Sequence, residues 1–417
     1  MALRVCIVGA GIGGLALAHA LHRRGLDYVI HDRDAGVDDT AGYRLHLAPE
    51  AFAALAAVLP PDSIDALREC GAGNGAFTRF AVLDHRGHTR LRLPMTHTGD
   101  VLMIGRRPLR RILARGLEVR WSSPVRGFDA SPSGVRLDDG AEFDLLVAAD
   151  GTGSRTAERW VGRPTARPAG VIGIAGRALL PQRVPADLSH GPAFAIGPGG
   201  VGAFFSMDAA QSLPAAQSLP AAQSLPAAQG PPAARRPDAA GEGDPAAEPP
   251  SVVWSIAAAA ADIHDASSAG LIAEVHRLTP AWSDDFHALV DRSAPSEVAA
   301  FPFFLPAALE PWPSGPVTVL GDAIHPMPPT AGAGASTAIL DAVHLANDLA
   351  ERPLPDALAA YRARLLTYAP AAVAEALPAL AWQRRLRNPL LFAAATEIAF
   401  PLANAVLRAR RAVGGSG

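Results

Sequence analysis

The order of apolar and polar positions predicts an α/β fold at the start of the chain. An apolar run at Arg4–Val8 predicts a buried strand, and Gly14–Arg24 has the period of a helix. A second apolar run follows at Asp27–His31. A strand, a helix and a strand in this order are typical of a βαβ unit with a parallel sheet.

Strands predominate further along, and helices dominate from Pro355 to the end. Phe80–Asp84 and Thr89–Leu93 predict a hairpin. The other main elements that the pattern predicts are a helix at Leu109–Arg115, strands at Val125–Ala130, Val135–Leu137 and Phe143–Ala149, a helix at Leu271–Leu278 and a strand at Val317–Leu320. We therefore expect an α/β fold, with a Rossmann-type domain interleaved with a mixed β-sheet domain and followed by a helical C-terminus.

A low-complexity segment interrupts the second half of this pattern. From residue 209 the hexapeptide AAQSLP occurs three times, and sequence rich in Pro, Ala and Gly continues to about residue 250. This composition cannot bury a core, so we predict a disordered insertion at 209–250. Val201–Met207 and Ser251–Ala257 predict strands on either side, which places the insertion at the tip of a hairpin. A tether for a partner is the alternative interpretation.

Composition excludes several classes of chemistry. The formal net charge is −3, so nothing favours binding to nucleic acid. The basic residues are all arginine, which excludes a lysine Schiff base and a P-loop. The two cysteines, Cys6 and Cys70, are too few for a disulfide scaffold or a Cys-rich zinc site, and no metal site is expected. A cytoplasmic location is expected.

One apolar stretch near the C-terminus bears on membrane association. Pro389–Leu407 is apolar but carries Glu397 mid-way, followed by Pro401 and Asn404. We expect a helix that docks on the body of the protein, and membrane association is not expected. A helix lying on a membrane surface is the alternative interpretation.

The first predicted βα turn carries a dinucleotide-binding motif. Gly9, Gly11 and Gly14 match G-x-G-x-x-G between the predicted strand and helix. The glycines allow a tight turn, close approach of a pyrophosphate and close packing of the helix on the strand. Asp32 ends the next predicted strand, 23 residues after Gly9, where an acid binds ribose hydroxyls.

Two later segments favour FAD over NAD as the dinucleotide. Asp144–Arg155, DLLVAADGTGSR, is an apolar strand that ends in Asp150-Gly151. Another predicted strand ends in Gly321-Asp322, where the carboxylate can bond a ribityl chain. The loop 326–334 then delivers the N-terminus of a helix, at about Ala335, to the ligand.

With these motifs the chain resembles the FAD-dependent aromatic hydroxylases, single-component flavoprotein monooxygenases related to p-hydroxybenzoate hydroxylase. The Gly-rich fingerprint, the Asp150-Gly151 segment and the Gly321-Asp322 segment match in order and spacing over nearly the whole chain. The last is the most specific, because Gly-Asp-Ala-x-His-Pro-x-x-Pro leading to Gly-x-Gly-Ala and Asp-Ala is the signature of the family.

The resemblance implies a set of cofactor contacts. Asp32 and Arg33 contact the adenosine part, Arg106 lies near the flavin, and Asp322 holds the ribityl–pyrophosphate region. Asp150 belongs to a segment that serves both FAD and NAD(P)H. The full set of expected cofactor-binding residues is Gly9, Gly11, Gly13, Gly14, Asp32, Arg33, Arg106, Asp150, Asp322, Pro329, Gly332, Gly334 and Ala335. The other arginines near Arg106 are interpreted as a basic helix face.

The sequence departs from the family at two of these positions. The family often has Gln or Arg at Ala333 and Asn at Ser336. We expect the shorter side chains to remove contacts, so that flavin binding rests more on the backbone.

The resemblance also implies a reaction. NAD(P)H reduces FAD, O2 forms a flavin C4a-hydroperoxide, and an apolar, aromatic or polycyclic small molecule is hydroxylated or epoxidised. The helix starting near Ala335 suits negative charge on the flavin pyrimidine edge. Catalytic residues remain unidentified. Arg44 and His46 are candidates, because they share one side of the alternating stretch GYRLHL, with solvent-facing residues as the alternative. His325 is expected to be structural.

Three alternatives remain open at this point: Baeyer–Villiger oxygenation by the same fold, a flavin oxidoreductase that does not oxygenate, and a non-catalytic flavin-binding scaffold. The oligomeric state is also open. The expected domains are a FAD-binding domain at 1–75, 100–168 and 315–355, a substrate-binding sheet domain at 76–99 and 169–314, and C-terminal helices at 356–417.

Overall fold

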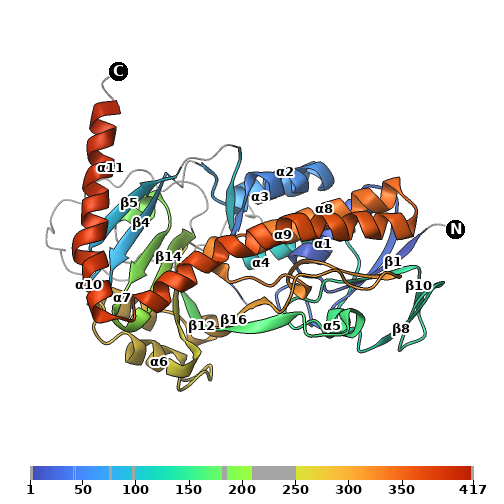
Figure 1. Ribbon diagram of the computed structural model, residues 1–417. Helices are drawn as coiled ribbons and strands as arrows, with labels where there is room; N and C mark the ends of the chain where they lie inside the picture. The colour runs from blue at the N-terminus through green and yellow to red at the C-terminus, as the bar shows by residue number, and fades with distance from the viewer. Residues whose placement is uncertain are drawn as a thin grey trace, which may run out of the picture.

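A parallel sheet forms one half of the molecule (Figure 1). The computed structural model describes residues 3–40, 42, 44–74, 78–95, 99–180, 186–208 and 250–414. The strands of this sheet, in spatial order, are β17 (Val317–Val319), β11 (Leu145–Ala148), β1 (Arg4–Val8), β2 (Asp27–His31) and β7 (Val119–Arg120). All neighbouring pairs are parallel. The residues of β11 and β17 are all buried, as expected for a parallel sheet covered on both faces.

Each face of the parallel sheet is covered by a different layer. Helices α1 (Ile12–His22) and α8 (Gly334–Glu351) pack together, and the side chains of Val5 and Ile7 belong to their core. Cys6 and Val8 point to the other face, where they join the core of a small antiparallel sheet. That sheet consists of β8 (Phe128–Ser131), β9 (Gly134–Leu137) and β10 (Glu142–Phe143).

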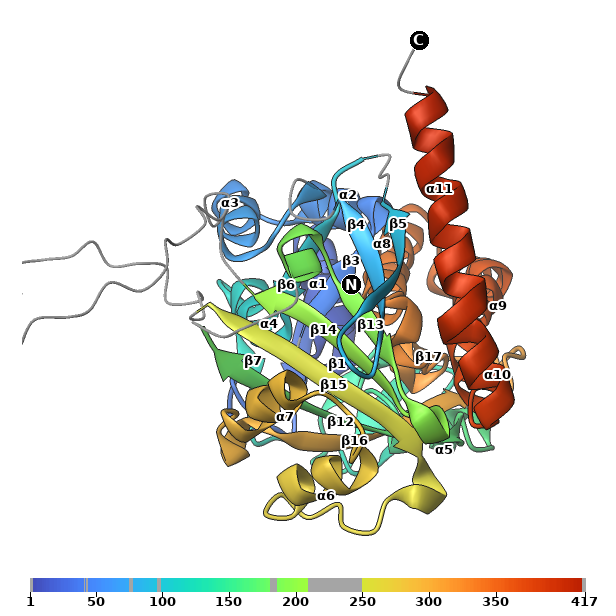
Figure 2. The same ribbon diagram turned by 90° about the vertical axis from the view of Figure 1, so that its left-hand side faces the viewer.

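A larger mixed sheet forms the other half of the molecule (Figure 2). Its strands, in spatial order, are β16 (Ala299–Pro306), β12 (Ala166–Leu179), β15 (Ser251–Ala259), β14 (Gly202–Asp208), β13 (Ala193–Ile196), β4 (Arg79–Asp84) and β5 (Thr89–Pro94). Only β13 and β4 pair in parallel among these strands. Helices α6 (Leu271–Leu278) and α7 (Asp284–Asp291) cover one face, where Trp254 and Phe286 pack edge to face.

Between the two halves lies a two-stranded ribbon of β3 (Arg44–Leu47) and β6 (Leu102–Gly105). Three helices flank it: α2 (Pro49–Val58), α3 (Pro61–Cys70) and α4 (Arg106–Ala114). Pro49 and Pro61 stand at the first position of their helices, where the missing N–H of proline costs nothing. These two helices were not predicted from the apolar pattern.

The long helix α9 (Leu354–Arg385) connects the two halves (Figure 1). At its first half, the Tyr361 hydroxyl donates to the carbonyl of Val319 in the parallel sheet (2.9 Å). At its last turn, Arg384 donates to the carbonyl of Ala169 in the large sheet (2.9 Å). The chain ends in α10 (Pro389–Ala393), a π-helical turn (Ala394–Ala399) and α11 (Phe400–Gly414).

The fold class expected from the sequence is confirmed: a Rossmann-type domain, a mixed sheet and a helical C-terminus. Several element boundaries were wrong, among them those of two elements. The helix predicted at Leu109–Arg115 begins at Arg106, and the strand predicted at Phe143–Ala149 divides into β10 and β11. The division occurs at Asp144, whose carboxylate accepts a hydrogen bond from the amide of Arg4 (2.7 Å). The domain limits given above stay a prediction.

The hairpin flanking the repeats is present, with β14 and β15 antiparallel up to the pair Asp208–Ser251. The insertion predicted at 209–250 lies outside the described residues up to residue 249.

We predict that replacing 209–250 by Asn-Gly leaves the fold and the FAD content intact. Because loop closure depends only weakly on length, the free energy of unfolding should rise by no more than about 3 kcal/mol.

Thermal unfolding measures this effect. A Gly/Ser linker of the same length as 209–250 is the control, since it keeps the length and changes the composition. A large loss of stability in both variants would mean that the segment packs on the body.

Candidate dinucleotide-binding site

The Gly-rich turn connects β1 to α1 and leaves space for a ligand. Gly9 has a φ of +110°, and a Cβ there would overlap the carbonyl of Ala149 at the end of β11. A Cβ on Gly14 would overlap the carbonyl of Gly9, so the helix could not approach the strand. A Cβ on Gly11 would meet nothing within 4 Å. The start of α1 has no capping side chain and no acid in its first turn, so its N–H groups suit a pyrophosphate.

Asp32 holds this turn in place from the end of β2. Its carboxylate is 8% exposed and accepts hydrogen bonds from the amides of Ala10 (2.5 Å) and Asp34 (2.7 Å). It also lies 3.4 Å from a guanidinium nitrogen of Arg110. Asp32 is therefore at the expected place beside the Gly-rich turn, while its contact with ribose stays a prediction. Arg33, its neighbour, is exposed.

Arg110 is a functional residue that the sequence interpretation missed. It was assigned to a basic helix face, but the side chain is only 3% exposed. Its Nε donates to the carbonyl of Ala10 (2.9 Å), and Nη2 pairs with Asp34 (2.8 Å) as well as Asp32. The sequence feature that could have identified Arg110 is its spacing of four residues from Arg106, which places both arginines on one side of α4.

Asp150 lies where β11 ends, next to the Gly-rich turn. A Cβ on Gly9 would lie 2.8 Å from the Cα of Asp150. Its carboxylate accepts hydrogen bonds from the hydroxyls of Ser154 and Thr156, at the start of α5 (Arg155–Val161). Burial raises the pKa of Asp150, and the hydrogen bond from Ser154 opposes the rise. A contact between Asp150 and a ligand stays a prediction.

Asp322 lies at the end of β17, in a short 3₁₀ turn (Gly321–Ala323). Among the described residues its carboxylate has no hydrogen bond and no ion pair. Burial raises the pKa of Asp322, whereas the nearby positive charges of His325 and Arg106 lower it. A half-buried carboxylate without a protein donor fits the hydroxyls of a ribityl chain.

Arg106 starts α4 on the same side of the molecule. Its Nε donates to Thr40 Oγ1 (3.2 Å), and the side chain packs against Gly42, which has a φ of +113°. Burial lowers the pKa of Arg106, and the charge of Asp322 raises it. The two residues that the resemblance assigned to the flavin therefore influence each other electrostatically.

The neighbours of Asp322 are fixed by a buried carboxylate, Asp341, which was not among the expected site residues. One oxygen accepts from the amide of Gly321 (2.9 Å) and bonds His325 Nε2 (2.7 Å), and the other accepts from the Tyr368 hydroxyl. Asp341 and His325 are both fully buried. His325 is therefore structural in this sense, as expected. The sequence feature that could have identified Asp341 is its position in the Asp-Ala pair that ends the family's Gly-Asp signature motif.

The loop that follows brings α8 close to the ribbon. Gly332 has a φ of +66°, and a Cβ there would lie 3.2 Å from the Cβ of His46. Ser336 Oγ donates to the carbonyl of His46 (3.1 Å) and accepts from the amide of Ala48 (3.0 Å). The hydroxyl thus joins α8 to β3, and the expectation that Ser336 offers fewer contacts to the flavin stays a prediction. Pro329 is exposed, and Ala335 is half-buried in the first turn of α8.

Helix α8 begins at Gly334, and its start is not capped by a side chain. No acid stands in its first turn, so the N–H groups there can stabilise a negative charge. A Cβ on Gly334 would make ordinary contacts, 3.6 Å to Met327 Cγ and 3.8 Å to Asp322 Oδ1. The helix start and the free carboxylate of Asp322 thus border the same space.

The two catalytic candidates contact different elements. Arg44 donates to Ser206 Oγ in β14 (3.2 Å) and to the carbonyl of Met103 in β6 (3.1 Å), so it joins the ribbon to the large sheet. His46 lies beside Gly332 in the loop before α8. No catalytic role follows from these contacts alone. Among the described residues, no group of three or more His, Cys, Asp or Glu could hold a metal.

Comparison with known proteins agrees with this geometry. A family model described as an NAD(P)-binding Rossmann-like domain matches residues 7–54, and one described as a FAD binding domain matches residues 305–376. Aurachin C monooxygenase/isomerase of Stigmatella aurantiaca is 26% identical over 379 residues, covering 87% of this chain and 84% of that protein. A crystal structure of a FAD containing monooxygenase from Photorhabdus luminescens subsp. laumondii TTO1 is 27% identical, with a TM-score of 0.69, and covers 93% of this chain and 98% of that chain.

The chain is similar to FAD-dependent monooxygenases in sequence and in fold over most of its length. It is thus an oxidoreductase with FAD as its cofactor, as the resemblance implied. A "Probable FAD-dependent monooxygenase" of Arthroderma benhamiae is 33% identical over 166 residues, covering 36% of this chain. That match spans only 37% of the fungal protein.

We predict that Arg110→Met strongly destabilises this monooxygenase and weakens FAD binding. The substitution leaves Asp32 and Asp34 without their buried counter-charge, which typically costs about 3–5 kcal/mol. Thermal unfolding of the apoprotein and fluorescence titration with FAD measure the two effects. Arg111→Met is the matched control, because Arg111 lies on the same helix and pairs with Asp38 at the surface. Equal effects of the two substitutions would contradict the role of Arg110.

We also predict that Gly334→Asp lowers FAD affinity by about tenfold or more, since a carboxylate beside Asp322 opposes negative charge at the start of α8. The flavin reduction potential should fall as well. Gly334→Asn is nearly isosteric and neutral, and Gly334→Ala tests the small steric change that the open space around Gly334 allows. Both controls should retain FAD. If Asp and Asn act alike, the effect is steric and the electrostatic role of the helix start is wrong.

Proposed function

We propose that this enzyme uses NAD(P)H and O2 to hydroxylate or epoxidise an apolar, aromatic or polycyclic small molecule on bound FAD. The observation that carries the proposal is the meeting of three strand ends in one place. The Gly-rich turn, Asp150 and Asp322 follow β1, β11 and β17, which are adjacent and parallel. Ligands of open α/β sheets bind at the carboxyl ends of their strands.

The protein's own residues would hold the two halves of FAD. The Gly-rich turn and the start of α1 fit the pyrophosphate. Asp322 would accept hydrogen bonds from the ribityl hydroxyls. The start of α8 stabilises negative charge on the flavin ring. The chemistry that FAD supplies when bound is hydride acceptance and activation of O2.

The large sheet is the proposed wall for the substrate. Residues of β14 alternate between its two faces, and Phe205 packs with Phe286 under the helices α6 and α7. Phe204 therefore shares the opposite face with Ser206, which contacts Arg44. This places a half-buried aromatic ring on the side that faces the ribbon. An apolar ring there favours an apolar substrate and excludes water from the reaction.

Arg44 has a proposed positioning role. Its guanidinium joins β3 to β14 and so keeps the flavin side and the substrate side in register. An acidic hydroxyl or a carbonyl of a substrate could also accept from it. A cytoplasmic location is part of the proposal, and both cysteines are free and buried.

The test measures NAD(P)H oxidation and O2 uptake by the FAD-loaded enzyme with a panel of naphthols and quinolones. We predict that at least one compound stimulates both rates and gains one atom from ¹⁸O2. Phe204→Ala should raise KM for that compound about tenfold with FAD affinity unchanged, because a buried aromatic contact is lost. Phe392→Ala is the control, as Phe392 lies in α10 and packs in the cluster of Val82 and Leu91.

Two outcomes would favour the alternatives. NAD(P)H oxidation without incorporation of labelled oxygen would indicate a flavin oxidoreductase that does not oxygenate. Conversion of a cyclic ketone to a lactone, with no hydroxylation of the aromatic panel, would indicate Baeyer–Villiger oxygenation.

A further inference from the structure

The C-terminal arm, which we define as Pro389–Gly414, carries an uncovered apolar face. Its large apolar side chains are between 45% and 80% exposed: Leu390, Leu391, Ile398, Leu402 and Val406. Ile398, Leu402 and Val406 follow one another at intervals of four residues, so they lie along one side of the helix. Single exposed apolar residues are common on proteins, but a continuous row of them indicates a binding surface.

The opposite side of the arm is packed on the large sheet. Phe392, Phe400 and Leu407 join the apolar cluster of Val82 and Leu91 on the β4–β5 hairpin. Asn404 Oδ1 accepts from the amide of Arg92 in β5 (3.2 Å). Figures 1 and 2 show α11 beside this hairpin at one end of the molecule, with the C-terminus directed away from the body. The arm is therefore fixed to the protein by one face only.

The C-terminal end of the chain is basic, although the chain as a whole has a formal net charge of −3. Residues 376–417 contain six arginines, three of them in the arm, and one acidic residue, Glu397. The carboxylate of Glu397 is already paired with Arg90 of the hairpin (3.0 Å). Arg385 and Arg408 are exposed and have no ion pair among the described residues.

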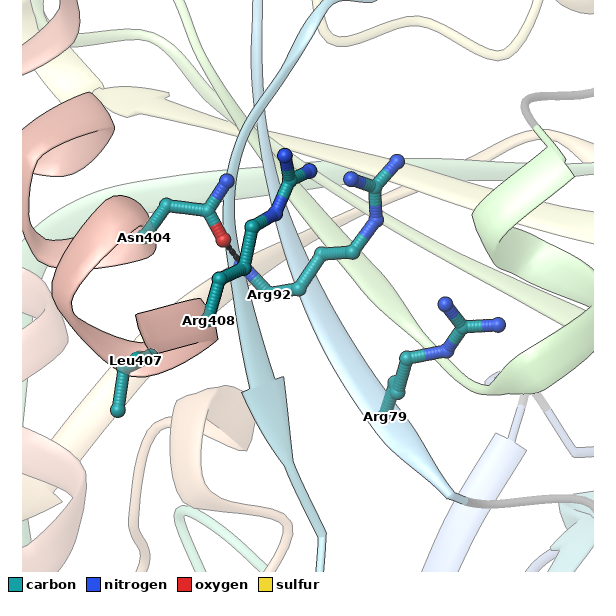
Figure 3. A pocket seen from close by; sticks show the side chains of 5 residues that line it. All are labelled: Arg79, Arg92, Asn404, Leu407 and Arg408. Carbon is teal, nitrogen blue, oxygen red and sulfur yellow. Dashed lines mark hydrogen bonds between the residues drawn. The ribbon is translucent and has the colours of Figure 1, made fainter. Parts of the chain in front are cut away.

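A basic pocket lies at the junction of the arm and the hairpin (Figure 3). It has a volume of about 210 Å³ and is lined by Arg79, Arg92, Asn404, Leu407 and Arg408. A single carboxylate, Asp187, forms ion pairs with the guanidinium groups of Arg92 (N to O, 2.8 Å) and, at longer range, Arg79 (N to O, 3.9 Å). Three guanidinium groups with one counter-charge leave an excess positive charge that suits a phosphate.

We propose that the C-terminal arm binds a lipid surface that contains anionic phospholipids. The apolar face enters the boundary between headgroups and acyl chains, and the exposed arginines at the C-terminal end of the chain, Arg385 and Arg408, contact phosphates. Two helices, Leu354–Arg385 and Pro389–Ala409, are long and apolar enough to cross a membrane. The arm cannot cross one with its inner face packed on β4 and β5, so it lies in the plane of the interface.

Charge favours a lipid surface over a second copy of this chain. Two arms packed face to face would bring two sets of arginines together, and like charges repel. An anionic surface instead neutralises them. The sequence interpretation did not expect membrane association. It is revised here because the structure leaves the apolar face of the docked helix uncovered.

The test is sedimentation of the intact FAD-loaded protein with phosphatidylcholine vesicles, with and without phosphatidylglycerol. We expect binding only to the vesicles with phosphatidylglycerol, and weaker binding at high salt. The double variant Ile398→Glu/Leu402→Glu should lower the partition coefficient about tenfold or more, because two buried apolar contacts are lost. Arg385→Gln/Arg408→Gln should lower it about tenfold, since each arginine contributes to attraction at an anionic surface.

Leu179→Glu is the control, because Leu179 is 53% exposed and lies outside the arm. It should bind vesicles as the unchanged protein does. FAD content verifies that each variant is folded, and the result does not depend on activity. The proposal is overturned if the unchanged protein stays in solution with phosphatidylglycerol vesicles, or if it binds both kinds of vesicle equally. It is also overturned if light scattering shows a dimer that Ile398→Glu/Leu402→Glu converts to monomers.

Discussion

The flavin side of this protein depends on one buried carboxylate. Asp341, on α8, accepts hydrogen bonds from the end of β17, from His325 in the following loop and from Tyr368 on α9. Burial lowers the pKa of His325, but the adjacent charge of Asp341 outweighs this effect and raises it. The two side chains are fully enclosed, so loss of either one would leave a buried polar group without its partner in the core. Asp322 owes its position to these bonds, because they fix the residues on either side of it.

The two acids that the resemblance linked to FAD differ in their surroundings. Asp32 is satisfied by backbone amides and by Arg110, so its first task is to shape the Gly-rich turn. Asp322 has no partner among the residues that the structure describes. Burying a carboxylate without a hydrogen-bond donor is unfavourable in free energy, and hydroxyl groups of a bound ligand would offset this penalty by donating hydrogen bonds to it. The unsatisfied acid therefore identifies the ligand-facing position more clearly than the satisfied one.

Much of this arrangement could be predicted from local sequence. The strands β1 and β2, the β4–β5 hairpin and the start of α8 follow from apolar period and glycine position, which are local properties. Helices α2 and α3 were missed, because their apolar faces are short and proline was not weighed as a starting residue. Arg110 and Asp341 were missed for another reason. The hydrogen-bond partners of Arg110 lie at least 71 residues away in sequence and those of Asp341 at least 16, so only the folded chain shows that the two side chains are buried.

The pairing of Asp208 with Ser251 has a genetic consequence. The ladder between β14 and β15 fixes both ends of the connection, so the number of residues between them does not alter the sheet. Each AAQSLP unit is encoded by a whole number of codons, and tandem repeats are gained or lost by slippage during DNA replication. Such events preserve the reading frame and the strand register alike. The length of this segment is therefore free to drift between closely related strains while the core of the enzyme stays unchanged.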